Sequence, residues 1–262
     1  MNSKNAILAV SFGTSFNSSR SITIGAIEST LAESFPQYTV RRAFTSGMII
    51  SKLKKRDSIC IDNVDEALRK LADEGFTNVY IQPTHMIEGE EYDLIKATAE
   101  SFSGRFAKIS VGRALLSKEA DLHSLAKILD THTAEWAVSG TARVFMGHGT
   151  EHAVNPVYKK LQNVIESDGI PDMYIATVEA SPTIRDIVRV LKTGNIKRAV
   201  LSPLMIVAGD HAVNDMAGSG EDSWKSILER EGVEVICRIE GLGSMYEVQQ
   251  MIVEHCKEMT DR

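Results

Sequence analysis

The feature that most constrains this chain is the regular alternation of short apolar, β-rich runs with amphipathic helical stretches from end to end. This alternation is typical of βα units, in which parallel strands form a sheet that helices cover. We predict eight strands, at residues 6–12, 38–44, 78–83, 108–112, 143–147, 174–179, 198–204 and 233–239. The pattern therefore predicts an α/β fold with mainly parallel sheets.

The helices between the strands have recognisable end signals. Residues 181–194, for example, have Ser181 as the expected N-cap, Pro182 in the first turn and Gly194 at the end. These signals support the division of the chain into βα units.

The sequence also repeats itself. "NVYIQPTHMIEGEEY" and "RAVLSPLMIVAGDHA" align with Pro83 on Pro203, and "VSFGTS" and "MGHGTE" align with Gly13 on Gly149. Repetition of a supersecondary unit is the mark of a duplicated architecture. We therefore predict two similar α/β lobes. Their expected boundaries are residues 1–128 for the N-terminal lobe and 129–262 for the C-terminal lobe.

Composition excludes several classes of protein. The formal net charge of -6 argues against a general nucleic-acid binder, which needs a basic face. The three cysteines are scattered and odd in number, so they form neither a disulfide framework nor a C-x-x-C site, and they favour a reducing cytoplasm. No apolar run approaches the roughly 20 residues that span a bilayer, and no signal-peptide pattern is present. We expect a cytoplasmic protein without nucleic-acid or membrane partners.

Three metal-ligand side chains follow strands of the second half. His148 lies in "GHG", Glu179 in "VEASP" and His211 in "AGDHAVND", and their spacings of 31 and 32 residues are close to one βα unit of roughly 30 residues. Ligands bind beyond the carboxyl ends of strands in open α/β sheets. Each histidine alone could be an ordinary polar residue, and Glu179 could simply favour a helix N-terminus. Their common placement favours a divalent metal site with an open coordination position.

Nucleotide and hydrolase motifs are absent. The sequence has no G-x-x-x-x-G-K-[ST], H-E-x-x-H or G-x-S-x-G, and "EGLGSMY" breaks the dinucleotide fingerprint because Tyr246 stands at its third glycine position. We expect no nucleotide cofactor.

Two other segments are candidates for ligand contacts. The turn "VSFGTSF" could hold a carboxylate through Ser11, Thr14 and backbone N–H groups, and residues 41–56 form a basic run that could equally be a solvated face. His85 precedes three nearby glutamates, which makes it either a metal-access patch or a solvated acidic loop, and we favour the loop.

Several segments together resemble the anaerobic cobalt chelatases of cobalamin synthesis, the CbiK-type sirohydrochlorin cobaltochelatases of the class II chelatase family. The segments are "SFGTS", "RAFTSGMIISKLKKRD", "MGHG", "VEASP", "PLMIVAGDHAVNDMAG" and "DSWK", and they extend over essentially the whole chain. The resemblance implies two Rossmann-like or flavodoxin-like lobes facing a central cleft. It also implies ATP-independent insertion of Co²⁺ into sirohydrochlorin with release of two protons, in anaerobic cobalamin (vitamin B12) biosynthesis.

The resemblance implies that His148, Glu179 and His211 hold the metal. Since a neutral imidazole can accept a proton near physiological pH, we also assign catalysis to these residues, with His148 as the principal base and with His211 and Glu179 delivering the metal and accepting charge. Phe12 aligns with His148, so one metal site per chain is expected. Fe²⁺, Ni²⁺ or Zn²⁺ could occupy the same ligands, so an iron or nickel chelatase of the same fold, leading to siroheme or haem-like products, is an alternative. A non-catalytic tetrapyrrole or metal carrier and a zinc hydrolase remain alternatives.

Sirohydrochlorin is rich in carboxylates, which would give the basic run a function. By position alone we assign substrate binding to Ser11, Gly13, Thr14, Arg41, Arg42, Ser46, Lys52 and His85. Since the family tends to assemble, a homo-oligomer is expected.

Overall fold

The computed structural model describes residues 3–261, and the chain divides into two compact units. Unit 1 comprises the described residues up to Ser117 together with those from Gly243 onward, and unit 2 comprises residues 118–242. The boundary predicted between residues 128 and 129 differs from this division. The reason is packing: helix α10 (Tyr246–Thr260) lies against α2 and β3 of unit 1, so the chain end returns to the first sheet.

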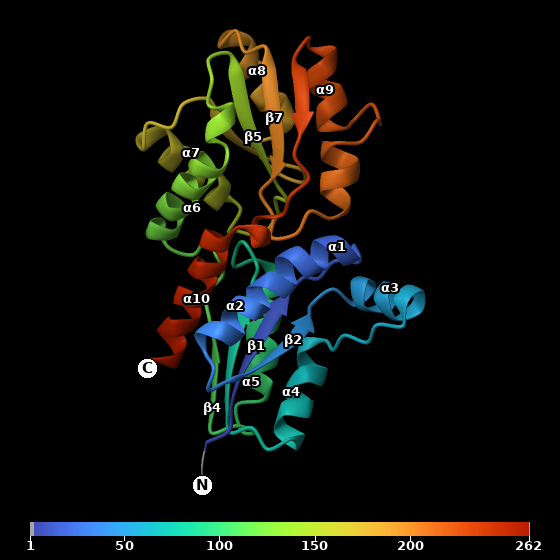
Figure 1. Ribbon diagram of the computed structural model, residues 1–262, viewed down its shortest axis with the longest axis vertical. Coiled ribbons are helices and arrows are strands. Elements are labelled where there is room, and N and C mark those ends of the chain that lie inside the picture. Colours follow the sequence, from blue (N-terminus) through green and yellow to red (C-terminus); the bar gives the residue numbers. More distant parts are fainter. Residues whose placement is uncertain (1–2, 262) are drawn as a thin grey trace. The chain divides into compact units, whose positions relative to one another are not determined.

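Unit 1 is built on one parallel sheet with strand order β2-β1-β3-β4 (Figure 1). The strands are β1 (Asn5–Ser11), β2 (Thr39–Phe44), β3 (Asn78–Pro83) and β4 (Lys108–Val111). Its helical segments are α1 (Asn17–Arg20), η1 (Ser21–Gly25), α2 (Ala26–Ser34), α3 (Gly47–Asp57), α4 (Val64–Asp73), α5 (Glu90–Ser101) and α10. Strand β1 is apolar and buried over most of its length because helices cover both faces of the sheet.

Unit 2 repeats this design with strand order β6-β5-β7-β8. The strands are β5 (Thr141–Gly147), β6 (Met173–Thr177), β7 (Arg198–Pro203) and β8 (Glu234–Cys237). The helical segments are α6 (Glu119–His132), η2 (Ala134–Trp136), α7 (Pro156–Ser167), α8 (Ile184–Thr193), η3 (Ala212–Met216) and α9 (Trp224–Arg230), and η4 (Leu242–Ser244) lies at the boundary with unit 1. All eight predicted strands occur, and the two-lobe α/β fold is confirmed.

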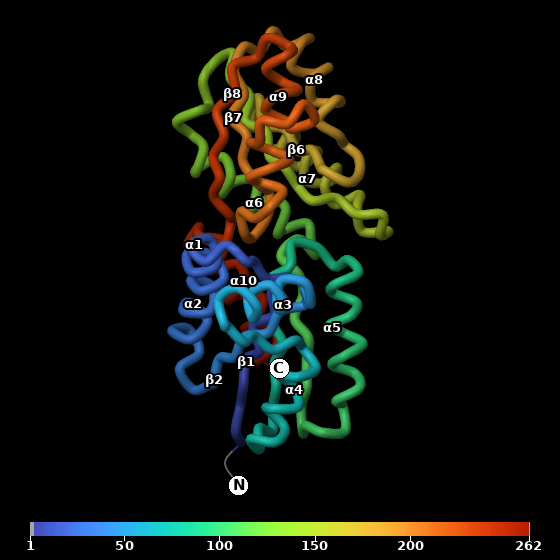
Figure 2. Tube along the Cα trace, turned by 90° about the vertical axis from the view of Figure 1, so that its right-hand side faces the viewer, coloured from blue at the N-terminus to red at the C-terminus, as the bar shows by residue number. Residues whose placement is uncertain are grey.

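Helices lie on both sides of each sheet (Figure 2). In unit 1, α4 and α5 bury their apolar faces against one side of β1 and β3, while α2 and α10 cover the other. In unit 2, α8 and α9 pack with β5 and β7 in one core cluster. No helix among the described residues is long and apolar enough to cross a membrane.

The start of α8 differs from the prediction. Thr183, not Ser181, is the N-cap, because the Asp186 carboxylate accepts a hydrogen bond from the Thr183 backbone N–H at 2.9 Å and completes a capping box. The Ser181 carbonyl instead accepts a hydrogen bond from the Asn155 side chain. The predicted end at Gly194 is correct.

Helix α4 offers a direct test of the cap chemistry. Asn63 Oδ1 accepts from the Glu66 N–H at 2.9 Å, and the Glu66 carboxylate accepts from the Asn63 N–H at 3.0 Å. We expect Asn63→Ala to lower the free energy of unfolding by about 1 kcal/mol, measured by urea denaturation. Glu100→Ala, at an exposed position of α5, is the control and should have a much smaller effect. An unchanged midpoint for Asn63→Ala would show that the cap contributes nothing.

Candidate metal centre

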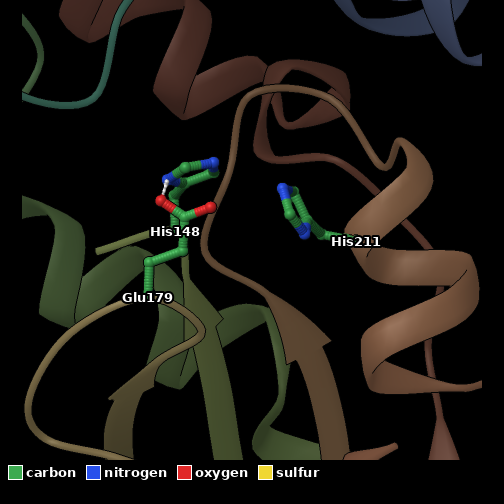
Figure 3. A group of neighbouring side chains, drawn as sticks. All are labelled: His148, Glu179 and His211. Carbon is green, nitrogen blue, oxygen red and sulfur yellow. Dashed lines mark ion pairs between the residues drawn. The ribbon is translucent and has the colours of Figure 1, made fainter. Parts of the chain in front are cut away.

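Three loops at the carboxyl edge of the unit 2 sheet bring His148, Glu179 and His211 together (Figure 3). His148 directly follows β5, Glu179 lies two residues after β6, and His211 immediately precedes the π-helical segment η3 that follows β7. The strands β6, β5 and β7 are parallel neighbours, so their carboxyl ends share one edge. The predicted juxtaposition of these three side chains is therefore present in the structure.

The two glycines beside His148 are required by close packing. A Cβ atom on Gly147 would lie 2.5 Å from the Tyr158 ring. Gly149 has a φ of +82°, and a Cβ there would lie 2.8 Å from the backbone nitrogen of Ala180. A side chain at either position would collide with its neighbours, so the glycines allow the β5 loop to turn sharply and leave the His148 side chain exposed.

The loops after β5 and β6 are joined by hydrogen bonds. The Glu179 backbone N–H donates to the His148 carbonyl at 2.9 Å. The Asn155 side chain also bridges the loops, because it accepts from the Thr150 N–H at 3.1 Å and donates to the Ser181 carbonyl at 3.1 Å. These contacts hold the backbones of two ligand residues in a fixed relation while their side chains stay accessible.

The side chains form an open cluster. His148 Nδ1 lies 3.5 Å from Glu179 Oε2, and the His148 and His211 rings are perpendicular with centroids 4.7 Å apart. One ligand atom from each residue lies within 4.8 Å of the other two. Two ligand atoms on opposite sides of a metal with bonds of about 2.1 Å span about 4.2 Å, so the cluster is close to the size that a bound ion needs. No other group of three such residues is this close among residues 3–261.

Hydrogen-bond partners define which imidazole nitrogen is available. His148 Nδ1 lies 2.8 Å from the Gly149 carbonyl oxygen, which can only accept, so this nitrogen carries the hydrogen. His211 Nδ1 lies 2.5 Å from the Asp215 carboxylate. Both rings therefore leave the Nε2 lone pair for a metal or a proton. Asp215 was not among the predicted site residues, although its position four residues after His211 in "HAVND" is a recognisable helical spacing.

Five of the predicted substrate-binding residues lie at the corresponding edge of the unit 1 sheet. They are Ser11, Gly13, Thr14, Ser46 and His85. Gly13 has a positive φ of +101°, and its counterpart in unit 2, Gly149, has a positive φ of +82°. The hydroxyl groups at this edge are buried and have internal partners: Ser11 accepts from Thr84 at 2.8 Å, and Ser46 caps α3. These two hydroxyls are therefore already engaged within unit 1.

The arginines of the basic run lie elsewhere. Arg41 and Arg42 are within β2 and not beyond its end. Arg41 pairs with Glu74 at 3.1 Å, and Arg42 forms a two-pronged ion pair with Glu28, whose hydrogen bond raises the pKa of Arg42. Lys52 is exposed on α3 and has no ion-pair partner among the described residues. Of these three cations, only Lys52 is uncommitted.

His85 is more enclosed than a solvated loop residue. Its Nδ1 atom is buried without a hydrogen-bond partner in the described structure, and its Nε2 lies 3.4 Å from Thr45 Oγ1. Burial lowers the pKa of His85 to about 4. The imidazole is therefore neutral at pH 7, and any contact with a substrate carboxylate would be a hydrogen bond and not an ion pair.

The sequence matches the cobalt chelatase (CbiK) family over residues 5–261. The chain belongs to the cobalt chelatase family. It is 37% identical over 252 residues to the sirohydrochlorin cobaltochelatase of Salmonella typhimurium, covering 96% of this chain and 95% of that one. It is 35% identical over 244 residues to the sirohydrochlorin cobaltochelatase CbiKC of Nitratidesulfovibrio vulgaris, covering 91% and 84%. Membership of this family confirms the implied enzyme class, a metal chelatase.

Solved structures support the fold independently. SirB from Bacillus subtilis, solved with Fe³⁺, has a TM-score of 0.64 at 13% identity and covers 97% of this chain and 95% of its own. CbiX, described as the terminal enzyme for biosynthesis of siroheme in denitrifying bacteria, has a TM-score of 0.55 at 17% identity and covers 97% and 98%. This cobalt chelatase family member therefore shares its fold with both of these proteins.

Replacing Gly149 should disturb the metal centre. Gly149→Ala introduces both a strained φ and a collision, whereas Gly140→Ala introduces the strained φ alone, since nothing lies within 4 Å of its Cβ position. We expect Gly140→Ala to lower stability by about 1–2 kcal/mol without changing Co²⁺ affinity. Gly149→Ala should cost more and also weaken Co²⁺ binding, measured by urea unfolding and metal titration. Equal effects of the two variants would contradict the packing argument.

The imidazole of His85, which is partly exposed but has a buried Nδ1 atom, makes stability depend on pH. The folded pKa of about 4 lies below the ordinary value of 6.5, so the unfolded chain binds the extra proton between these values. Stability from this group is complete above pH 6.5 and is lost as the pH falls toward 4. We expect His85→Gln to show a smaller loss of unfolding free energy than the parent between pH 7 and 5. His123→Gln, which changes an exposed imidazole, is the control, and parallel curves for all three proteins would refute the expectation.

Proposed function

We propose that this chain inserts Co²⁺ into sirohydrochlorin in anaerobic cobalamin biosynthesis, without ATP. The observation that carries the proposal is the open cluster of His148, Glu179 and His211 at one sheet edge. The family match and the names of the two curated relatives support the metal and the substrate.

The donor set suits a metal that must be released again. Two imidazoles and one carboxylate bind Co²⁺ but leave coordination positions open. The side chains of His148, Glu179 and His211 are 48%, 53% and 34% exposed, so an incoming macrocycle can reach the ion. A closed set of four protein ligands would instead favour retention of the metal.

The same residues can accept the two protons that the substrate releases. Insertion replaces two pyrrole N–H protons of the macrocycle by one M²⁺ ion, while the ion exchanges its protein ligands for ring nitrogens. Each imidazole that releases the ion regains an Nε2 lone pair and can accept one proton. We assign His148 as the principal base. His211 and Glu179 hold the incoming metal and accept the second proton, so that each proton has an acceptor.

The carboxylates of the substrate need cationic or N–H donors. Lys52 is our first candidate for an ion pair, because Arg41 and Arg42 already have carboxylate partners. Backbone N–H groups of the turn around Gly13 are the second. His85 is proposed as a neutral hydrogen-bonding group only.

Replacement of His148 tests the proposal. Purified protein is incubated with sirohydrochlorin and Co²⁺, and insertion is followed in the visible spectrum over many turnovers. We expect His148→Ala to lower the insertion rate at least about 100-fold, because loss of a general base alone typically costs 10²–10⁴. His123→Ala is the matched control, since it removes an exposed imidazole of unit 2 that pairs with Asp168.

The outcomes separate the alternatives. A His148→Ala variant that keeps the parental rate refutes the assigned mechanism. A spectral change that stops at one equivalent of protein indicates a carrier, and no change with the parent protein refutes insertion and makes a zinc hydrolase the next hypothesis. Competition among Co²⁺, Fe²⁺ and Ni²⁺ in the same assay identifies the preferred metal, because intrinsic affinity rises in the order Fe²⁺, Co²⁺, Ni²⁺ and the ligands alone do not specify it.

A further inference from the structure

We infer that Asp215 is a positioning residue that fixes the tautomer and the ring orientation of His211, so that Nε2 is presented to the metal. This inference rests on the proposed function of the cluster. It assigns Asp215 no contact with metal or substrate, only with the imidazole of His211.

The contact is short and comes from a well-anchored segment. His211 Nδ1 lies 2.5 Å from Asp215 Oδ2. Asp215 belongs to η3, a π-helical turn that begins directly after His211, and such turns occur frequently at functional sites. Ala212 and Met216 of the same turn are fully buried in the core of unit 2, which fixes the backbone that carries the carboxylate.

The alternative interpretation is that His211 and Asp215 form an ordinary ion pair on the surface. Exposed ion pairs four residues apart contribute little, and the two side chains here are 34% and 45% exposed. What distinguishes this pair is its place in the cluster, because the His211 ring lies perpendicular to the His148 ring with the two centroids 4.7 Å apart (Figure 3). A carboxylate that accepts from the distal N–H is the usual support for a metal-binding histidine.

The two histidines of the cluster are supported differently. His148 is held by the carbonyl oxygen of Gly149, which no side-chain substitution can remove. His211 depends on a side chain. A neutral imidazole without a partner favours the tautomer with hydrogen on Nε2, which would block the lone pair that the metal needs. Loss of Asp215 should therefore affect His211 and leave His148 unchanged.

The direct test reads the tautomer without metal. Protein labelled with ¹⁵N in its histidines is studied by long-range ¹H–¹⁵N correlation NMR at about pH 8. In the parent protein we expect the His211 hydrogen on Nδ1, and in Asp215→Ala a shift of the population to Nε2. Asp215→Asn should keep the parental pattern, because its amide oxygen can still accept the hydrogen bond. The His148 pattern should be the same in all three proteins.

Co²⁺ binding supplies the functional readout. We expect Asp215→Ala to weaken Co²⁺ binding by about 10–100-fold, measured from the visible absorption of the bound ion, and Asp215→Asn to restore most of the affinity. Asp210→Ala is the matched control: it removes an equal charge beside His211, but its carboxylate accepts from Asn214 and does not contact the imidazole. Its affinity should stay within about twofold of the parent, since only general charge is lost.

Each result is decisive. An unchanged His211 tautomer in Asp215→Ala overturns the inference, and so does an equal loss of affinity in Asp210→Ala, which would indicate a charge effect. Should parent and variants all bind Co²⁺ equally and insert it, only the positioning role fails. If the parent protein does not insert Co²⁺, the proposed function fails, while the tautomer measurement still decides whether Asp215 orients His211.

Discussion

The hydrogen bond from the Glu179 backbone N–H to the His148 carbonyl is the interaction on which the metal centre depends. It extends the parallel pairing of β5 and β6 past the strand ends, so the loops that carry two ligands leave the sheet together. The close approach is available only because Gly149 has no side chain to meet Ala180. Backbone geometry therefore positions His148 and Glu179, and their side chains remain partly exposed.

The duplicated scaffold shows how one backbone can carry different chemistry. Gly13 and Gly149 occupy equivalent turns with positive φ, and the two sheets have the same strand order. The residue between strand and glycine is Phe12 in unit 1, 44% exposed, and His148 in unit 2. Because the turn fixes only the backbone, the exposed position carries an apolar ring in unit 1 and an imidazole in unit 2.

Metal transfer places opposite demands on the ligands. The ion must be bound firmly enough to be loaded, yet each protein ligand must dissociate as nitrogens of the substrate ring coordinate the ion. The candidate set of two imidazoles and one carboxylate, all partly exposed, is suited to both demands. Each imidazole has a hydrogen-bond partner on its Nδ1 side, which orients the ring, and in the proposed mechanism the Nε2 atoms exchange metal for proton.

The sequence by itself determined the eight strands, the duplication and the meeting of His148, Glu179 and His211 at one sheet edge, because alternating hydrophobicity, turn glycines and the length of a βα unit are local or periodic signals. Tertiary structure alone decided the rest. The amphipathic pattern of α10 does not specify which sheet it covers, and only packing returns it to unit 1. From charge alone, the sequence suggested the same substrate-binding role for Arg42 and Lys52. In the folded chain, however, the Arg42 guanidinium pairs with the Glu28 carboxylate. The burial of His85 and the support of His211 by Asp215 likewise depend on contacts formed after the chain has folded, which local residue patterns do not encode.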